Sequence, residues 1–147
     1  MNQVVVKQEK SGYQIVEAYK SLRTNLQFCG EDKKVIAVTS CTPNEGKSSV
    51  SMQLGISLAE SGKRVILIDA DLRKSVLLGR TKTQKSVRGL AHFLSGQATL
   101  EDVICSTNVK NFYMIYSGPF PPNPAELLGG KNFRSLLNAL RKVYDYV

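Results

Sequence analysis

Apolar positions along this chain repeat first with a helical period and then with the period of strands, and their order outlines the fold. Residues 13–28 carry apolar side chains at helical spacing. The apolar run 35–38 predicts a strand buried on both faces, and residues 47–61 predict a helix that stops at Gly62. A second buried strand is predicted at 64–69. Strand, loop, helix and strand in this order predict a βαβ unit with parallel strands and a right-handed crossover.

The pattern in the second half of the chain predicts four further helices and one further strand. Residues 89–94 and 100–104 have the pattern of two short helices, and residues 112–116 that of a third strand. Pro124 opens another short helix, because proline favours the first helical position. Residues 133–144 predict a last amphipathic helix. The chain therefore predicts an α/β fold with a mostly parallel sheet flanked by helices.

A phosphate-binding loop is predicted between the first strand and the helix after it, where residues 38–50 read VTSCTPNEGKSSV. The pattern G-x-x-x-x-G-K-[ST] fits except that Cys41 replaces its first glycine. Gly46 allows the backbone to approach a phosphate, Lys47 can reach the outer phosphates, and the Ser48 hydroxyl can bind Mg²⁺. The alternative is a helix that begins with Gly-Lys-Ser and binds nothing.

The loop has further residues suited to this geometry. Pro43 and Asn44 favour a tight turn, because proline fixes φ and asparagine tolerates a left-handed backbone. Cys41 is expected to be a small buried thiol. The predicted nucleotide-binding residues are Pro43, Asn44, Glu45, Gly46, Lys47, Ser48 and Ser49.

Two acids follow the second predicted strand, in VILIDADLRK. Asp69 and Asp71 are two residues apart in an extended chain, so their side chains point to the same side. Ligands of open α/β sheets bind at this carboxyl end, so both acids are expected to face the phosphate loop. A carboxylate pair beside Mg·ATP can bind metal-bound water or accept a proton from a hydroxyl. The alternative is a surface turn in which the acids pair with Arg73 and Lys74.

Composition narrows the possible partners. The 147 residues are 42% hydrophobic, enough for the core of one domain, and their formal net charge is +8. Six basic residues and no acid lie between positions 73 and 88, namely Arg73, Lys74, Arg80, Lys82, Lys85 and Arg88. Nucleic acid or a bound anion could explain them, but no aromatic residues interleave as in single-strand binders. We therefore predict no nucleic-acid partner.

Cysteine and apolar patterns indicate a cytoplasmic protein. The three cysteines are widely spaced and form no CxxC or Cys/His pair, so we expect isolated reduced thiols and no structural metal. No apolar stretch reaches the length of a membrane span, and the N-terminus MNQVVVKQEK has no signal-peptide pattern.

Several segments together resemble one family. EAYKSLRTN, the phosphate loop, LIDADLRK, GLAHFLSGQATLEDVI and GPFPPNPAELL follow one another as in the bacterial tyrosine kinases of capsular and exopolysaccharide synthesis. The similarity extends from about residue 13 to the end. These kinases are similar in fold to the ParA/MinD ATPases and unrelated to eukaryotic protein kinases.

The resemblance implies ATP and Mg²⁺ as cofactors, with Lys47, Asp69 and Asp71 as catalytic residues and Ser48 and Asp69 at the metal. Asp69 could also act as base toward a tyrosine hydroxyl. In the N-terminal region, which we delimit as residues 1–30 before a kinase domain at 31–147, Glu17, Lys20 and Arg23 match the subunit-contact motif E-x-x-R-x-x-R, with lysine at its middle position. The alternative is an exposed helix face with spaced charges.

The family also implies partners: a membrane-anchored activator that recruits the kinase to the inner face of the cell membrane, and tyrosine-rich tails of neighbouring subunits. A further strand of this family would open at residues 144–147, so we expect the fold to be incomplete at its C-terminus and the chain to have little independent kinase activity. Two alternatives remain. One is a ParA/MinD-type ATPase, although residues 41–45 lack the additional lysine typical of that group. The other is a nucleotide-binding module without turnover.

Overall fold

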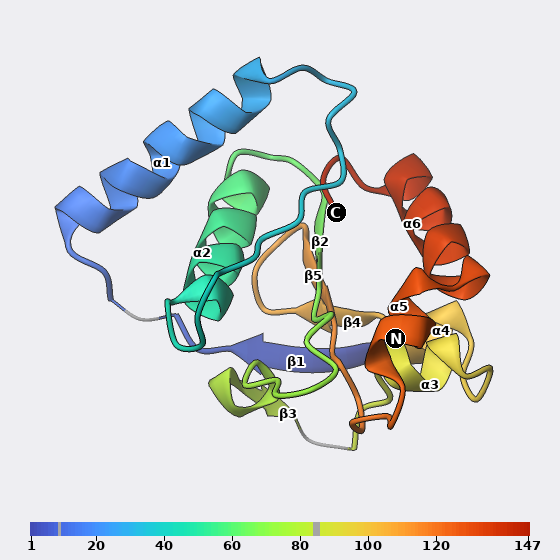
Figure 1. The fold of residues 1–147 in the computed structure, drawn as a ribbon. Coiled ribbons are helices and arrows are strands. Elements are labelled where there is room, and N and C mark those ends of the chain that lie inside the picture. Colours follow the sequence, from blue (N-terminus) through green and yellow to red (C-terminus); the bar gives the residue numbers. More distant parts are fainter. Residues whose placement is uncertain (9, 84–85) are drawn as a thin grey trace.

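A computed structural model describes residues 1–8, 10–83 and 86–147, so Lys85 of the basic segment lies outside the described residues. Helices lie on both sides of a central sheet, with α1 and α2 on one side and α3 to α6 on the other (Figure 1). The helices are α1 (Tyr13–Phe28), α2 (Lys47–Glu60), the 3₁₀ turn η1 (Leu78–Arg80), α3 (Leu90–Leu94), α4 (Leu100–Val103), α5 (Pro124–Gly129) and α6 (Lys131–Val143). The strands are β1 (Asn2–Val6), β2 (Val65–Ile68), β3 (Thr81–Thr83), β4 (Cys105–Thr107) and β5 (Phe112–Ile115).

The sheet confirms the α/β class but is mixed rather than mostly parallel in the part of the chain that the structure describes. Its strand order is β2-β5-β4-β1-β3. Strands β2 and β5 are parallel, as are β1 and β4, while β1 pairs with β3 and β4 with β5 in antiparallel fashion. The short connection between β4 and β5 explains one antiparallel pair, because a parallel pair needs a long crossover. Asn111 in that connection has a φ of 65°.

Strands β2 and β5 alternate their side chains between two hydrophobic clusters. Val65 and Phe112 belong to the cluster under α2, whereas Ile66 and Ile115 belong to the cluster with α3 and α6. A strand covered on both faces reads as an unbroken apolar run, which is the pattern from which β2 was predicted. Strands β2 and β5 are therefore held by burial on both faces.

Helices were predicted more accurately than strands. Helix α1 spans the predicted residues 13–28, and α2 ends before Gly62, whose φ of 91° and amide bond to the Ala59 carbonyl form a left-handed C-terminal stop. Strand β1 was missed, yet it lies between β4 and β3 and buries Val4 and Val6. Five residues with one short valine run give too little periodicity to predict such a strand.

The predicted strand 35–38 is the main difference in the first half. The structure assigns no strand there, and Val35 and Val38 are 43% and 37% exposed. Within the described residues, the segment hydrogen-bonds to Val147: the Ile36 amide donates to the Val147 carbonyl at 2.9 Å, and the Val147 amide donates to the carbonyl of the preceding Lys34 at 2.8 Å. Tyr146 in turn forms a parallel bridge with Val65, so residues 146–147 lie between this segment and β2.

Replacing Gly89 by alanine should destabilise the fold, because its α-carbon packs against the backbone after β5. An added Cβ would lie 2.3 Å from the Gly118 nitrogen and 2.5 Å from the Tyr116 carbonyl oxygen. Since backbone cannot rotate away, we expect Gly89→Ala to lower the free energy of unfolding by about 3 kcal/mol, measured by urea denaturation. Gly129→Ala, where a Cβ meets no atom within 4 Å, is the control, and equal stabilities of the two variants would contradict this account.

Candidate functional site

The predicted phosphate loop leads directly into α2. Asn44 and Gly46 have φ angles of 63° and 84°, so two left-handed residues turn the chain into the helix that begins at Lys47. The Val50 amide donates to the Gly46 carbonyl, which places the amides of residues 47–49 ahead of the first helical hydrogen bond. Such amides, together with the helix dipole, form a site for anions.

Glu45 holds the loop in shape. Its Oε1 accepts from the Thr42 hydroxyl at 2.6 Å, and its Oε2 accepts from the Cys41 amide at 3.1 Å. The Thr42 hydrogen bond lowers the pKa of Glu45, so the carboxylate stays ionised. Cys41 is exposed and not buried as expected. Glu45 thus contributes to the site through the shape of the loop.

Asp69 lies at the end of β2 as predicted and is only 5% exposed. Its amide donates to the Ile115 carbonyl at 2.8 Å, which extends the pairing of β2 with β5 by one residue. Burial raises the pKa of Asp69 above its ordinary value, and a hydrogen bond from the Ser75 hydroxyl partly opposes this shift. A desolvated carboxylate of this kind attracts a cation strongly.

Asp71 connects the acidic segment to the phosphate loop. Its Oδ2 lies 3.7 Å from the Lys47 ammonium, and its Oδ1 accepts from the amides of Arg73 and Lys74 at 3.3 and 3.0 Å. Within the described part of the chain, the side chains of Arg73 and Lys74 form no ion pair with Asp69 or Asp71, contrary to the alternative of a simple surface turn. The arrangement brings the predicted phosphate lysine beside the predicted carboxylate pair.

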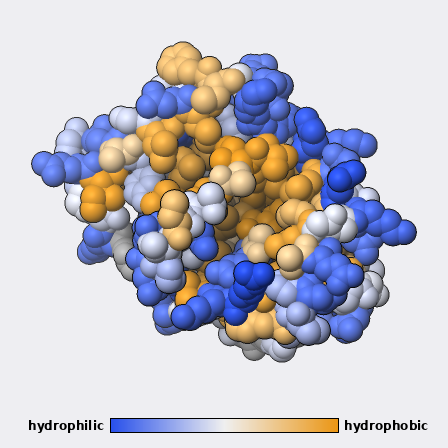
Figure 2. All heavy atoms as spheres, viewed as in Figure 1, coloured by the Kyte–Doolittle hydropathy of each residue, from blue (hydrophilic) through white to orange (hydrophobic). Residues whose placement is uncertain are grey.

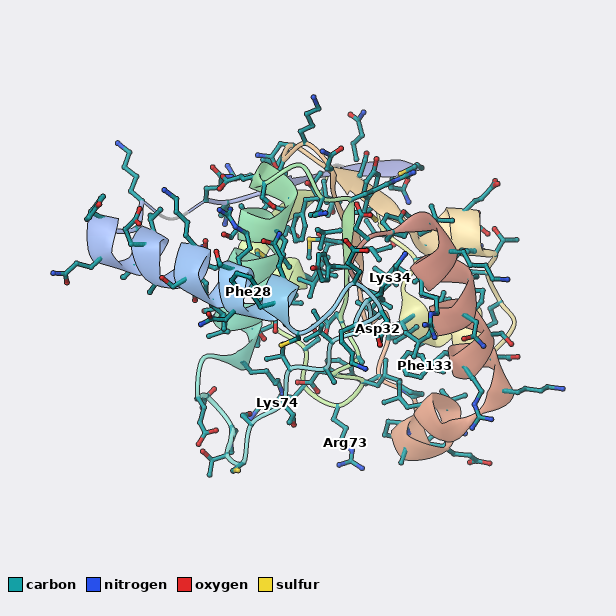
Figure 3. All side chains as sticks on the ribbon, turned by 90° about the horizontal axis from the view of Figure 1, so that it is seen from above. Phe28, Asp32, Lys34, Arg73, Lys74 and Phe133 are labelled. Carbon is teal, nitrogen blue, oxygen red and sulfur yellow. The ribbon has the colours of Figure 1, made fainter. Side chains whose placement is uncertain are left out.

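One cavity of about 450 Å³ collects these groups. Lys47, Ser48, Asp69 and Asp71 line it, together with residues 35–39 and apolar side chains of β2 and α6. Figure 2 shows apolar atoms gathered in a hollow on this face, and in Figure 3 Phe133 of α6 lies across from the segment that carries Asp32 and Lys34. The predicted catalytic and metal residues therefore share one site.

Other predicted binding residues lie outside this cavity. Ser49 accepts a hydrogen bond from Arg80 and lines a separate cavity with Lys7 and Met52. Pro43, Asn44, Glu45 and Gly46 form the loop but do not line the cavity of Lys47. Their contribution is to the path of the backbone.

The donor set fits a magnesium ion bound together with a phosphate. In residues 1–8, 10–83 and 86–147 no three His, Cys, Asp or Glu side chains gather as a metal site. Mg²⁺ usually keeps several waters and binds one or two carboxylates plus substrate phosphates, so it needs no such cluster. The Ser48 hydroxyl and the Asp69 and Asp71 carboxylates on one cavity match that requirement.

The three residues of the subunit-contact motif lie on α1 but do not act as one group. Glu17 and Lys20 form an exposed ion pair of 3.0 Å. Arg23 instead donates to the Ser57 carbonyl at 2.7 Å and to the Ser57 hydroxyl at 3.3 Å, which fastens α1 to α2. Sequence patterns gave no sign of this contact, because it joins residues 34 positions apart.

The basic segment is divided in the structure. Arg73 and Lys74 are exposed after Asp71, and Figure 3 shows Arg73 extending away from the ribbon. Arg80 is bound to Ser49, and Arg88 donates to the Gln97 carbonyl at 3.0 Å.

Ser75 was not among the predicted site residues, yet its hydroxyl donates to Asp69. No sequence motif relates a serine to an acid six residues before it, so this contact could not be predicted from the sequence.

Among the described helices, none has the length and apolar character required to cross a bilayer.

Comparisons with known proteins agree with this site. A family model described as an AAA domain matches residues 33–147. The tyrosine-protein kinase CpsD of Streptococcus agalactiae is 43% identical over 131 residues, which cover 89% of this chain and 57% of CpsD. The chain thus spans little more than half the length of this relative.

Solved structures give the same result. The kinase domain of the Escherichia coli tyrosine kinase ETK superposes with a TM-score of 0.85 at 30% identity, covering 98% of this chain and 66% of that domain. MinD of Pyrococcus horikoshii, solved with Mg-ADP, gives a TM-score of 0.62 at 27% identity over 77% of this chain and 46% of MinD. The predicted resemblance is therefore confirmed: this chain belongs to the AAA domain family, and within it is similar to the bacterial tyrosine-protein kinases.

Proposed function

We propose that this chain is the nucleotide-binding part of an ATP-dependent protein-tyrosine kinase that regulates capsular or exopolysaccharide synthesis. The observation that supports this most directly is the convergence of the α2 N-terminus, Lys47 and the two carboxylates Asp69 and Asp71 on one cavity. Phosphoryl transfer depends mainly on positioning and electrostatic stabilisation, and these groups supply both. The similarity to tyrosine kinases in sequence and fold adds the acceptor, a tyrosine hydroxyl.

Each group has a defined task in this proposal. The amides at the start of α2 and the Lys47 ammonium bind the ATP phosphates, and Lys47 exchanges its ion pair with Asp71 for the more highly charged phosphate. Ser48 and Asp69, supported by Asp71, would hold Mg²⁺. The metal, when bound, neutralises phosphate charge during transfer. Asp69, whose pKa is raised by burial, can also accept the proton of the tyrosine hydroxyl.

The partners belong to the same proposal. Exposed Arg73 and Lys74 directly after Asp71 suit an acidic, tyrosine-rich tail of a neighbouring subunit. Glu17 and Lys20 are exposed on α1 for contacts between subunits, with Arg23 holding the helix in place. A membrane-anchored activator recruits the protein to the cytoplasmic face of the membrane, and nucleic acid is not a partner.

Two measurements test the proposal. Calorimetric titration of the purified chain with ATP and Mg²⁺ tests the site, and phosphotyrosine detection on the chain and on an acidic tyrosine peptide tests the reaction. Phosphate release without phosphotyrosine would favour the second candidate, a MinD-type ATPase, which the superposition on MinD supports. Binding without either product would agree with the little independent kinase activity expected of this chain alone and would equally fit a nucleotide-binding module without turnover, whereas no binding would contradict all three functions.

Replacing Lys47 should weaken nucleotide binding without unfolding the chain. Lys47→Met removes a half-buried ammonium that lines the cavity. A hydrogen bond to a charged group contributes about 1.5–3 kcal/mol, so we expect ATP affinity to fall about 10- to 100-fold by calorimetry. Lys63→Met, at an exposed position beyond the end of α2, should bind as the wild type does; a similar loss in both variants would refute a specific role of Lys47.

Replacing Asp69 should stabilise the free protein while it abolishes the effect of Mg²⁺ on nucleotide binding. Burial raises the folded-state pKa of Asp69. At pH values between the ordinary and the raised pKa, Asp69 is therefore protonated in the folded protein and ionised in the unfolded chain. This group's contribution to stability therefore falls as the pH rises through that window. Asp69→Asn removes the buried charge, and we expect its free energy of unfolding at pH 7 to rise by about 1 kcal/mol in urea titrations.

Asp102 serves as a control of opposite sign. Hydrogen bonds from Thr99 lower the pKa of Asp102, so its contribution is present above the ordinary pKa and lost as the pH falls. Asp102→Asn should therefore reduce stability at pH 7, where Asp69→Asn increases it. If Asp69→Asn were less stable than the wild type at neutral pH, burial of the ionised Asp69 carboxylate would not be destabilising, and this account would be wrong.

A further inference from the structure

Ser75 contacts the buried carboxylate of Asp69, and the proposed reaction gives this hydroxyl no task. Its Oγ donates to Asp69 Oδ2 across the turn between β2 and η1. The Leu77 amide donates to the same Oγ at 3.3 Å. Because the Leu77 amide occupies an acceptor lone pair of the hydroxyl, the hydroxyl proton is free to point at Asp69.

The second oxygen of Asp69 is held as well. Asp69 Oδ1 accepts from the Asp71 amide at 3.2 Å, so both oxygens of one buried carboxylate have a donor from the loop that follows β2. Leu77, which anchors the far end of this arrangement, is 4% exposed and belongs to the hydrophobic cluster under α2. The orientation of Asp69 therefore depends on a short chain of contacts that ends in the core.

We propose that Ser75 is a positioning residue that fixes the Asp69 carboxylate in the orientation in which it binds Mg²⁺ together with the nucleotide. The inference rests on the proposed function, because it concerns the metal of that site. Groups that bond to a metal ligand and orient it commonly change metal affinity 10- to 100-fold when they are removed. A hydroxyl can do this because its single proton uses only one lone pair of Oδ2, so that oxygen can still accept a second partner.

A purely structural role would give a different result. A serine hydroxyl that accepts from the amide two residues later also stabilises a turn, and this bond to Leu77 exists whether or not a metal binds. Loss of the turn alone would lower thermal stability and leave the effect of Mg²⁺ unchanged. Loss of the contact with Asp69 would weaken the effect of Mg²⁺ and leave metal-free nucleotide binding unchanged.

The test compares ADP affinity, measured by calorimetry in Mg²⁺ and in EDTA, for the wild-type chain, Ser75→Ala and Ser75→Thr. The ratio of the two dissociation constants measures the coupling between metal and nucleotide. We expect this ratio to fall about tenfold in Ser75→Ala, with the EDTA affinity unchanged, and to be retained in Ser75→Thr, which keeps the hydroxyl. Ser86→Ala, at an exposed position before α3, is the matched control and should behave as the wild type.

Equal ratios in the wild type and Ser75→Ala overturn the inference, and so does an equal loss in the alanine and threonine variants, because the hydroxyl would then be irrelevant. A wild-type chain whose ADP affinity does not respond to Mg²⁺ overturns the proposed function, and the inference with it. Thermal unfolding of each variant shows that it is folded. If Ser75→Ala is not, Ser75→Cys, similar in shape but a weak donor, replaces it with the same expected loss.

Discussion

The parallel pairing of β2 with β5 is the constraint on which the rest of the structure depends. It runs in register from Val65 with Phe112 to Ile68 with Ile115, and the Asp69 amide continues it. Side chains of the two strands enter both hydrophobic clusters, so the helices on either side pack against the same backbone. Asp69 is the first residue beyond this pairing, and its position follows from the sheet rather than from a flexible loop.

The site contains a buried carboxylate, whose desolvation costs free energy, and contacts that offset part of this cost. Burial of Asp69 opposes its ionisation, and a carboxylate in such surroundings remains charged only where donors or cations are near. The loop after β2 provides the donors, while Lys47 is held next to the acids by Asp71. A site of this kind is more strained when empty than when it contains a cation, as is common for functional sites.

The sequence predicted the parts of this molecule whose residues repeat or form a motif. Helices α1 and α2, strand β2 and the cavity residues Lys47, Ser48, Asp69 and Asp71 were all found from periodicity and spacing. Strand β1 and the contact of Arg23 with Ser57 were not, since both depend on partners far along the chain. The segment 35–38 has the composition of a buried strand, but in the described part of the chain its backbone bonds to Val147 alone, and its valines remain partly exposed. The apolar composition of a segment indicates that it is suited to burial, but whether other elements cover it depends on the tertiary structure.

The bonds that Glu45 makes to Thr42 and Cys41 have a thermodynamic consequence for binding. They close the phosphate loop on itself in the free protein, with Asn44 and Gly46 already in left-handed conformations. Ordering a flexible loop on binding costs conformational entropy, at about 1–2 kcal/mol for each backbone residue. A loop that keeps its shape in advance avoids most of this loss, so the interaction energy of a phosphate with the amides of α2 contributes almost entirely to affinity. The residue at position 41 can therefore be a cysteine instead of glycine, because Glu45 fixes the path of the loop by bonding to the backbone amide, which every residue except proline possesses.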